Sequence, residues 1–235
     1  MIKLPLLETV QNYTKRLNRL IVCVFVLVGV AIVAYGHSTP PQTDTQNWND
    51  VFLSVPVAGS VDFIVQGTIR NGRSMTRPVD ERFGVGFSFK VGKYLTIIPN
   101  YLAIESQPFK GRQVHENRLS IASTIRFPVG GFTFADRSIF ERRLRRPGND
   151  TTRYRNRLQI DHPIGLAKQK LSVFVSDEVF YDWTVNEWVR NRAAIGVSKI
   201  WNKHLTLDLY YLRQNDARSF PGDLHIIGTA WRFKL

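Results

Sequence analysis

From Trp48 to the C-terminus, apolar and polar residues alternate with a period of two, and no stretch keeps an apolar face at helical spacing. The clearest run is residues 118–127, in which the odd positions read LISIF and the even positions read RSATR. Such alternation is typical of strands with one apolar and one polar face. The chain is therefore expected to be all-β.

The alternation predicts about eleven strands, near residues 48–57, 61–70, 81–91, 94–105, 116–127, 131–143, 152–162, 170–182, 187–200, 204–214 and 223–234. Globular strands hold about five or six residues, whereas a tilted strand needs roughly nine to eleven to cross a bilayer. Short turns such as Ala58-Gly59-Ser60 alternate with longer polar loops such as NGRSMTRPVD, as in outer-membrane barrels. We predict a transmembrane antiparallel β-barrel of about 10–12 strands.

An even number of strands, ten or twelve, is expected, because an odd number would bring the first and last strands together in parallel. The alternative fold is a soluble periplasmic barrel like a lipocalin, or a soluble sandwich, whose strands alternate in the same way.

The N-terminal region predicts export. Four basic residues and one acid precede residue 20, and the uncharged run LIVCVFVLVGVAIV follows at 20–33. Ala34 and Gly36 place small residues before His37, as a signal peptidase site requires. We expect a cleaved signal peptide at 1–36, a polar segment at 37–46 and an outer-membrane β-barrel at 47–235, in the bacterial outer membrane. A permanent anchor is disfavoured because the apolar run is shorter than the roughly twenty residues of a spanning helix.

The chain carries a formal net charge of +13. Beyond residue 36 there are 28 basic and 18 acidic residues, a net charge of +10, and 20 of the 28 are arginines. In the narrow interior of a small barrel these cations would repel one another unless carboxylates lie between them. We predict a structural charge network in the lumen, with an anion pore or ligand pocket as the alternative. Its candidate members are Arg118, Arg126, Arg155, Arg157, Glu178, Arg192 and Asp208.

A second basic set is expected in loops at the outward rim. Clustered guanidinium groups there would suit the phosphates of lipopolysaccharide. The candidates are Arg142, Arg143, Arg145 and Arg146. With outer-membrane lipid and lipopolysaccharide as partners, the charge excess needs no nucleic acid.

No catalytic, cofactor-binding or metal-binding residue is predicted. The single cysteine, Cys23, lies in the apolar run, and only His37 among the five histidines precedes a serine. The protein is not expected to be an enzyme. The alternative, a lipid hydrolase resembling lipid A deacylases, would need a histidine and a serine brought together from separate strands.

Aromatic residues support the membrane interpretation. The five tryptophans fall near predicted strand ends, as the two aromatic girdles of a barrel would require: Trp48, Trp183, Trp188, Trp201 and Trp231. The end of the chain, from Gly228 to Leu235, resembles the C-terminal signal read by the outer-membrane insertion machinery, which is therefore an expected partner.

Several short segments, in order, resemble the domain-of-unknown-function 2490 family of bacterial outer-membrane proteins. They are Trp48, the run RYRNRL at 153–158, EVF at 178–180, Asn191-Arg192 with Gly196, and LDLYY at 207–211. The resemblance implies an outer-membrane β-barrel without an established activity. The expected function is that of a barrel of unknown specific role, either a small pore or a structural envelope protein that contacts lipopolysaccharide.

Overall fold

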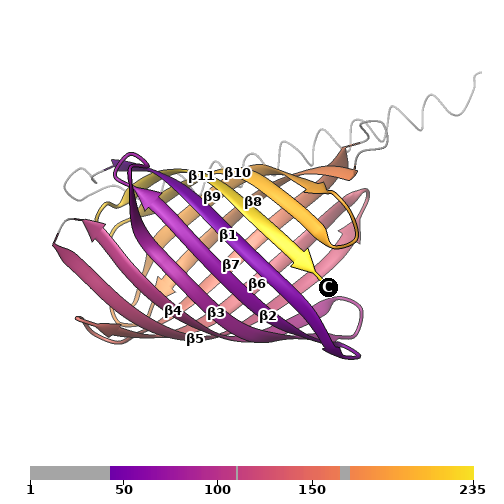
Figure 1. Cartoon of the computed structure of the whole chain (residues 1–235), viewed down its shortest axis with the longest axis horizontal. Helices are drawn as coiled ribbons and strands as arrows, with labels where there is room; N and C mark the ends of the chain where they lie inside the picture. The colour runs from indigo at the N-terminus through magenta and orange to yellow at the C-terminus, as the bar shows by residue number, and fades with distance from the viewer. Residues whose placement is uncertain (1–42, 110, 165–169) are drawn as a thin grey trace, which may run out of the picture. The chain divides into compact units, whose positions relative to one another are not determined.

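The structure, a computed structural model, describes residues 43–109, 111–164 and 170–235, which form a closed barrel of eleven strands. The strands are β1 (Thr43–Ala58), β2 (Val61–Gly72), β3 (Arg77–Val91), β4 (Leu95–Phe109), β5 (Arg112–Val129), β6 (Phe132–Arg146), β7 (Thr151–Ile164), β8 (Lys170–Asp182), β9 (Glu187–Ile200), β10 (Leu205–Asp216) and β11 (Asp223–Lys234). Each pairs with its neighbour in sequence, and Figure 1 shows them tilted around one wall. The all-β barrel prediction is confirmed.

The predicted signal peptide at 1–36 lies outside the described residues, as do residues 37–42 of the predicted polar segment. Residues 43–46 of that segment belong to β1. No helix in the part of the chain that the structure describes is long and apolar enough to cross a membrane.

Several strands are longer than the sequence pattern predicts, because the polar residues read as loops continue the hydrogen-bonded ladder. The predicted loop NGRSMTRPVD, for example, leaves only residues 73–76 between β2 and β3. We call the rim where β1 begins and β2 ends the loop rim, and the rim where β1 and β11 end the turn rim. The predicted contrast in loop length between the two rims is correspondingly weaker.

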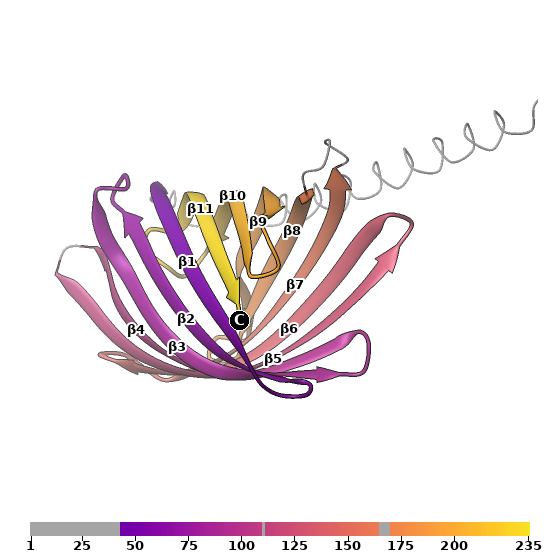
Figure 2. The ribbon, with the colours of Figure 1, turned by 45° about the vertical axis from the view of Figure 1, so that its right-hand side comes forward.

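The barrel closes through a parallel pair, β1 with β11, while all its other pairs are antiparallel. Figure 2 shows the two strands side by side and pointing the same way. The eleven predicted strands are all present, and the expectation of ten or twelve is wrong. An odd count is compatible with closure because a parallel ladder also pairs its backbone groups, with slanted instead of perpendicular hydrogen bonds.

The parallel seam can be tested with a disulfide. Asn49 on β1 is the register partner of Thr229 on β11, and the Thr229 hydroxyl donates to Asn49 Oδ1 at 2.8 Å. Register partners are close enough for a disulfide, so Asn49→Cys with Thr229→Cys should cross-link on oxidation. The change would appear as a mobility shift on non-reducing gels. Val51→Cys with Thr229→Cys is the control, because Val51 lies two residues beyond the register partner of Thr229 on the same face of β1. Equal cross-linking in both would contradict the parallel register.

The wall is apolar outside and charged inside, the reverse of a soluble barrel. Exposed outer-face side chains include Phe83, Phe87, Leu119, Ile121, Ile195 and Leu209. Four of the five tryptophans, Trp183, Trp188, Trp201 and Trp231, are also exposed. The alternation along each strand places the intervening residues in the lumen, and this arrangement fits a barrel surrounded by lipid.

Asp136 and Asp177 are carboxylates within the apolar outer face. Asp136 accepts a hydrogen bond from the Asn156 amide at 3.0 Å, and Asp177 accepts one from the Asn191 amide at 2.9 Å. A polar group removed from water is tolerated when it is hydrogen-bonded. The amide partners from neighbouring strands therefore reduce the cost of these two residues in the wall.

Candidate anion-binding lumen

The inner faces of β5 to β9 bring together acidic and basic side chains from five consecutive strands. Because side chains alternate along a strand, residues two apart, such as Arg153 and Arg155 on β7, face the lumen together. Register then places Glu141 of β6 beside Arg153, and Glu178 of β8 beside Arg192 of β9. Charges of opposite sign are thus neighbours across strands that are distant in sequence.

We call the resulting cluster the lumen network: Glu116, Glu141, Glu178, Arg118, Arg143, Arg153, Arg155 and Arg192. Glu116 binds Arg118 and Arg143, each at 2.6 Å. Glu141 binds Arg153 at 2.7 Å, Arg155 at 2.8 Å and Arg118 at 3.5 Å. Glu178 binds Arg155 at 2.7 Å and lies 3.6 Å from Arg192. The three glutamates therefore link five arginines into one connected group that retains an excess of two positive charges.

Two aromatic rings lie among these arginines. Phe180 is completely buried, and four guanidinium carbons lie 4.8–5.3 Å from its ring centroid, those of Arg153, Arg155, Arg190 and Arg192. Trp48 is 3% exposed and lies 3.6 Å from Arg70 and 4.9 Å from Arg192. The negative face of an aromatic ring attracts a cation, most strongly away from water. These rings therefore offset part of the repulsion between arginines that carboxylates leave unpaired.

A cavity of about 200 Å³ lies at the loop-rim end of the lumen, bordered by these side chains. Its lining includes eight arginines, Arg70, Arg82, Arg118, Arg143, Arg153, Arg155, Arg190 and Arg192, and two acids, Asp80 and Glu116. Three more acids bind arginines of the lining: Asp216 binds Arg190, Glu141 binds Arg153, and Glu178 binds Arg155. Even with those three acids included, the surroundings of the cavity are positively charged, which suits an anion.

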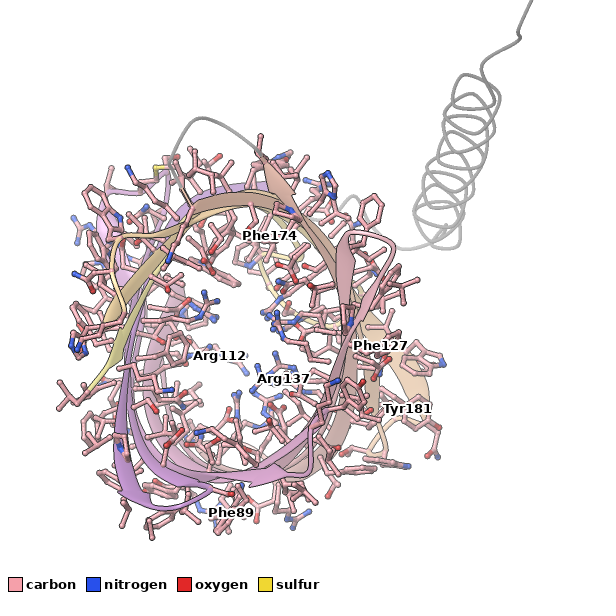
Figure 3. The ribbon with its side chains drawn as sticks, turned by 90° about the vertical axis from the view of Figure 1, so that its right-hand side faces the viewer. Phe89, Arg112, Phe127, Arg137, Phe174 and Tyr181 are labelled. Atoms are coloured by element: carbon pink, nitrogen blue, oxygen red, sulfur yellow. The ribbon has the colours of Figure 1, made fainter. Side chains whose placement is uncertain are left out.

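Figure 3 looks into the barrel and shows how the inner side chains surround a central space. Arg112 and Arg137 point toward this space, whereas Phe89 and Tyr181 point outward. No group of three or more His, Cys, Asp or Glu side chains gathers as a metal site within the described ranges.

The family model described as "Protein of unknown function (DUF2490)" matches residues 45–223, which is most of the barrel. The chain belongs to the DUF2490 family. No curated protein sequence matches it.

Solved barrels resemble this DUF2490 protein at low identity. LpxR from Salmonella typhimurium is 10% identical, with a TM-score of 0.45, over 77% of this chain and 86% of that one. The beta domain of the Bordetella autotransporter BrkA is 12% identical, with a TM-score of 0.44, over 75% and 82%. The anion-selective porin from Comamonas acidovorans is 13% identical, with a TM-score of 0.40, over 75% and 54%.

The predicted network residues of the DUF2490 barrel separate into two groups. Arg118, Arg155, Glu178 and Arg192 belong to the lumen network. The others lie on the inner face closer to the turn rim. There Arg126 is 3.6 Å from Asp161, Asp208 pairs with Arg232, and Arg157 is the register partner of Glu178.

The four arginines expected to face lipopolysaccharide do not form one loop cluster, since all of them belong to β6. Arg143 points into the lumen and binds Glu116, so its expected position in an outward loop is wrong. Arg142 lies 3.8 Å and Arg146 3.0 Å from Asp150, and Arg145 donates to the Asn149 carbonyl at 3.0 Å.

Asp150 lies in the connection before β7. The hydrogen bond from Arg146 lowers the pKa of its carboxyl, so Asp150 stays charged and neutralises part of the basic rim.

One further sequence expectation needs correction. Trp48 lies in the lumen instead of the outer girdle, because its side chain alternates with the outward Asn47 and Asn49 and its indole N–H donates to Gln46 Oε1 at 2.8 Å. Arg70, at the end of the strand predicted near 61–70, is an inner-face residue of β2 that lies 3.8 Å from Asp80.

Sequence reasoning missed two of the three network acids, Glu116 and Glu141. Glu116 could have been found, because it precedes Arg118 by two residues and so shares its face. Glu141 stands in the run Glu141-Arg142-Arg143, where consecutive residues are all charged. The alternation therefore does not tell which of them face the lumen.

Proposed function

We propose that this DUF2490 protein is an outer-membrane barrel whose lumen takes up and passes small anions. The observation that supports the proposal is the cavity at the loop-rim end, with eight arginines and two acids in its lining. Rings of Arg or Lys side chains are the usual means by which a pore favours anions. A barrel stabilised only by paired charges would not need this excess of cations.

The apolar outer face and the four exposed tryptophans support a location in the outer membrane. The last strand carries outward Ile227, Trp231 and Phe233 on an alternating pattern, which supports recognition of β11 by the insertion machinery. Arg142 and Arg146 at the loop rim are exposed and support contact with lipopolysaccharide phosphates, although Asp150 shares their charge. Export through a signal peptide at 1–36 is part of the same proposal.

We propose no covalent chemistry for the barrel. The contacts of the four histidines that the structure describes do not resemble a hydrolase site. His115 binds Glu105, His225 binds Tyr211 and Arg213, and the rings of His162 and His204 bond to backbone carbonyls. A serine hydrolase requires a histidine within hydrogen-bond reach of the nucleophile.

The proposal predicts anion selectivity in planar bilayers. Under a KCl gradient, the reversal potential of the purified barrel should lie toward the chloride equilibrium potential. Arg70 contributes a positive charge to the cavity, and its guanidinium group packs on the Trp48 ring and lies 3.8 Å from Asp80. Arg70→Gln removes this charge and should shift the reversal potential toward zero. Arg142→Gln, outside the lumen, is the matched control and should leave it unchanged. A barrel that inserts and gives no current, or one that prefers potassium, would contradict the proposal.

A further inference from the structure

Midway along the lumen, two arginines form no ion pair with the carboxylates that the structure describes. Arg137 on β6 and Arg157 on β7 are register partners, so both side chains project from the inner face at the same level. They lie on the turn-rim side of the lumen network, since Arg157 follows Arg155 by two residues along β7. Neither forms an ion pair within 4 Å with a described residue.

The carboxylates that could pair with these two residues are already engaged. Glu178, the register partner of Arg157, accepts from Arg155 Nε and Nη2 at 3.2 Å and 2.7 Å on Oε1. Its Oε2 lies 3.6 Å from Arg192 Nη1. Glu141, four residues beyond Arg137 on the same strand, holds Arg153 and Arg155. Two like charges therefore face each other without an acid between them.

Arg137 also carries a buried donor that nothing in the described structure satisfies. Its Nε is inaccessible to solvent and has no hydrogen-bond partner. The side chain points into the central space of the barrel in Figure 3. Buried polar groups in proteins are almost always paired, and an exception is often the site of a missing ion or ligand.

The surrounding inner face supplies hydroxyl groups instead of carboxylates. Thr124 of β5 is the register partner of Arg137, and Ser176 of β8 is the register partner of Gln159, two residues from Arg157. Gln159 itself donates to Asp161 at 2.8 Å. A guanidinium pair flanked by hydroxyl donors matches a tetrahedral oxyanion, because each planar fork can bind two oxygens and a hydroxyl can donate to a third.

We propose that Arg137 and Arg157 form a binding site for a small tetrahedral oxyanion, such as inorganic phosphate, inside the lumen. This inference rests on the proposed function only in requiring that the lumen admit anions from solution. An anion passing from the cavity at the loop rim would meet this pair next, and the site would select oxyanions over chloride by its directional hydrogen bonds.

The site is tested by titrating inorganic phosphate into the detergent-folded barrel and measuring binding by calorimetry. Arg137→Gln and Arg157→Gln should each weaken binding by on the order of tenfold to a hundredfold, as expected for losing a charge-assisted hydrogen-bonded contact. Arg137→Lys keeps the charge and loses the fork, and should bind with intermediate affinity. Arg126→Gln is the matched control, because Arg126 lies in the same lumen but is paired with Asp161 at 3.6 Å. The phosphate affinity of this variant should stay within a few-fold of wild type.

Folding of the variants is measured separately by heat-modifiable gel migration in phosphate-free buffer. Removing one of two facing cations should leave the melting temperature of Arg137→Gln equal to or above that of wild type, while its rise on adding phosphate should disappear. Phosphate binding that is the same in wild type and both glutamine variants would overturn the site, as would no binding to wild type. If the barrel is not anion-selective and yet loses phosphate binding in the variants, the proposed function fails and the site stands. Anion selectivity with unchanged phosphate binding gives the reverse conclusion.

Discussion

Glu141→Ala is expected to lower the free energy of unfolding of the barrel by about 3–5 kcal/mol. Glu141 is 2% exposed and binds three arginines from the two neighbouring strands, Arg153 and Arg155 of β7 and Arg118 of β5. Its removal takes from the buried Arg153 the one carboxylate that binds it among the described residues. Arg118 and Arg155 each lose one of two carboxylates and keep Glu116 and Glu178. Urea unfolding in phospholipid vesicles, followed by tryptophan fluorescence, should show a lower midpoint with an unchanged slope.

The same unfolding measurement should show how much each glutamate contributes to stability. Glu178→Ala is expected to cost less than Glu141→Ala, because only Arg155 lies within 3 Å of Glu178 and Arg192 is at 3.6 Å. Glu187→Ala is the control, since Glu187 binds Arg218 at the loop rim with both side chains 53% exposed, and such pairs contribute at most about 1 kcal/mol. A midpoint for Glu141→Ala equal to that of Glu187→Ala would mean that water, and not the glutamate, satisfies the lumen arginines.

The strands could be predicted from the sequence because lipid and the polar lumen impose opposite demands on alternate residues. Residues 118–127 follow that rule except at the small residues Ala122 and Ser123, and β5 contains them with the expected face outward. Where both faces are polar, the prediction loses its basis. Both faces of β1 are polar near Trp48, with Asn47 and Asn49 on one face and Gln46 on the other. The sequence therefore does not show which face points inward, and the expected position of Trp48 in the outer girdle is wrong.

Closure could not be predicted for a different reason. A strand pattern specifies which face is apolar but not which strand is the neighbour, and β1 and β11 are separated by almost the whole chain. The pairing within the lumen network could not be predicted for the same reason. Period two places Arg118, Arg155, Glu178 and Arg192 inside, but the stagger between strands decides which of them meet and leaves Arg126 and Asp208 with other partners.

Gly196→Ala is expected to destabilise the barrel by about 1–3 kcal/mol, because a methyl group at this position would overpack the inner wall. A Cβ on Gly196 would lie 2.5 Å from the Phe174 ring and 2.6 Å from the backbone carbonyl oxygen of Leu209. Phe174 is the cross-strand register partner of Gly196, so its ring covers the glycine from β8. The ring could rotate away, but the Leu209 carbonyl belongs to the β9–β10 ladder and cannot move without breaking it.

Gly67→Ala in β2 is the matched control for this change, because a Cβ there would meet no atom within 4 Å. Glycine in a strand carries an entropic cost of roughly 0.5–1 kcal/mol relative to alanine, so this variant should be as stable as wild type or slightly more stable. Unfolding midpoints in the same vesicles measure both variants. If Gly196→Ala matched Gly67→Ala, the close approach of β8, β9 and β10 around Phe174 would be wrong, and with it the stagger that carries Glu178 to Arg192.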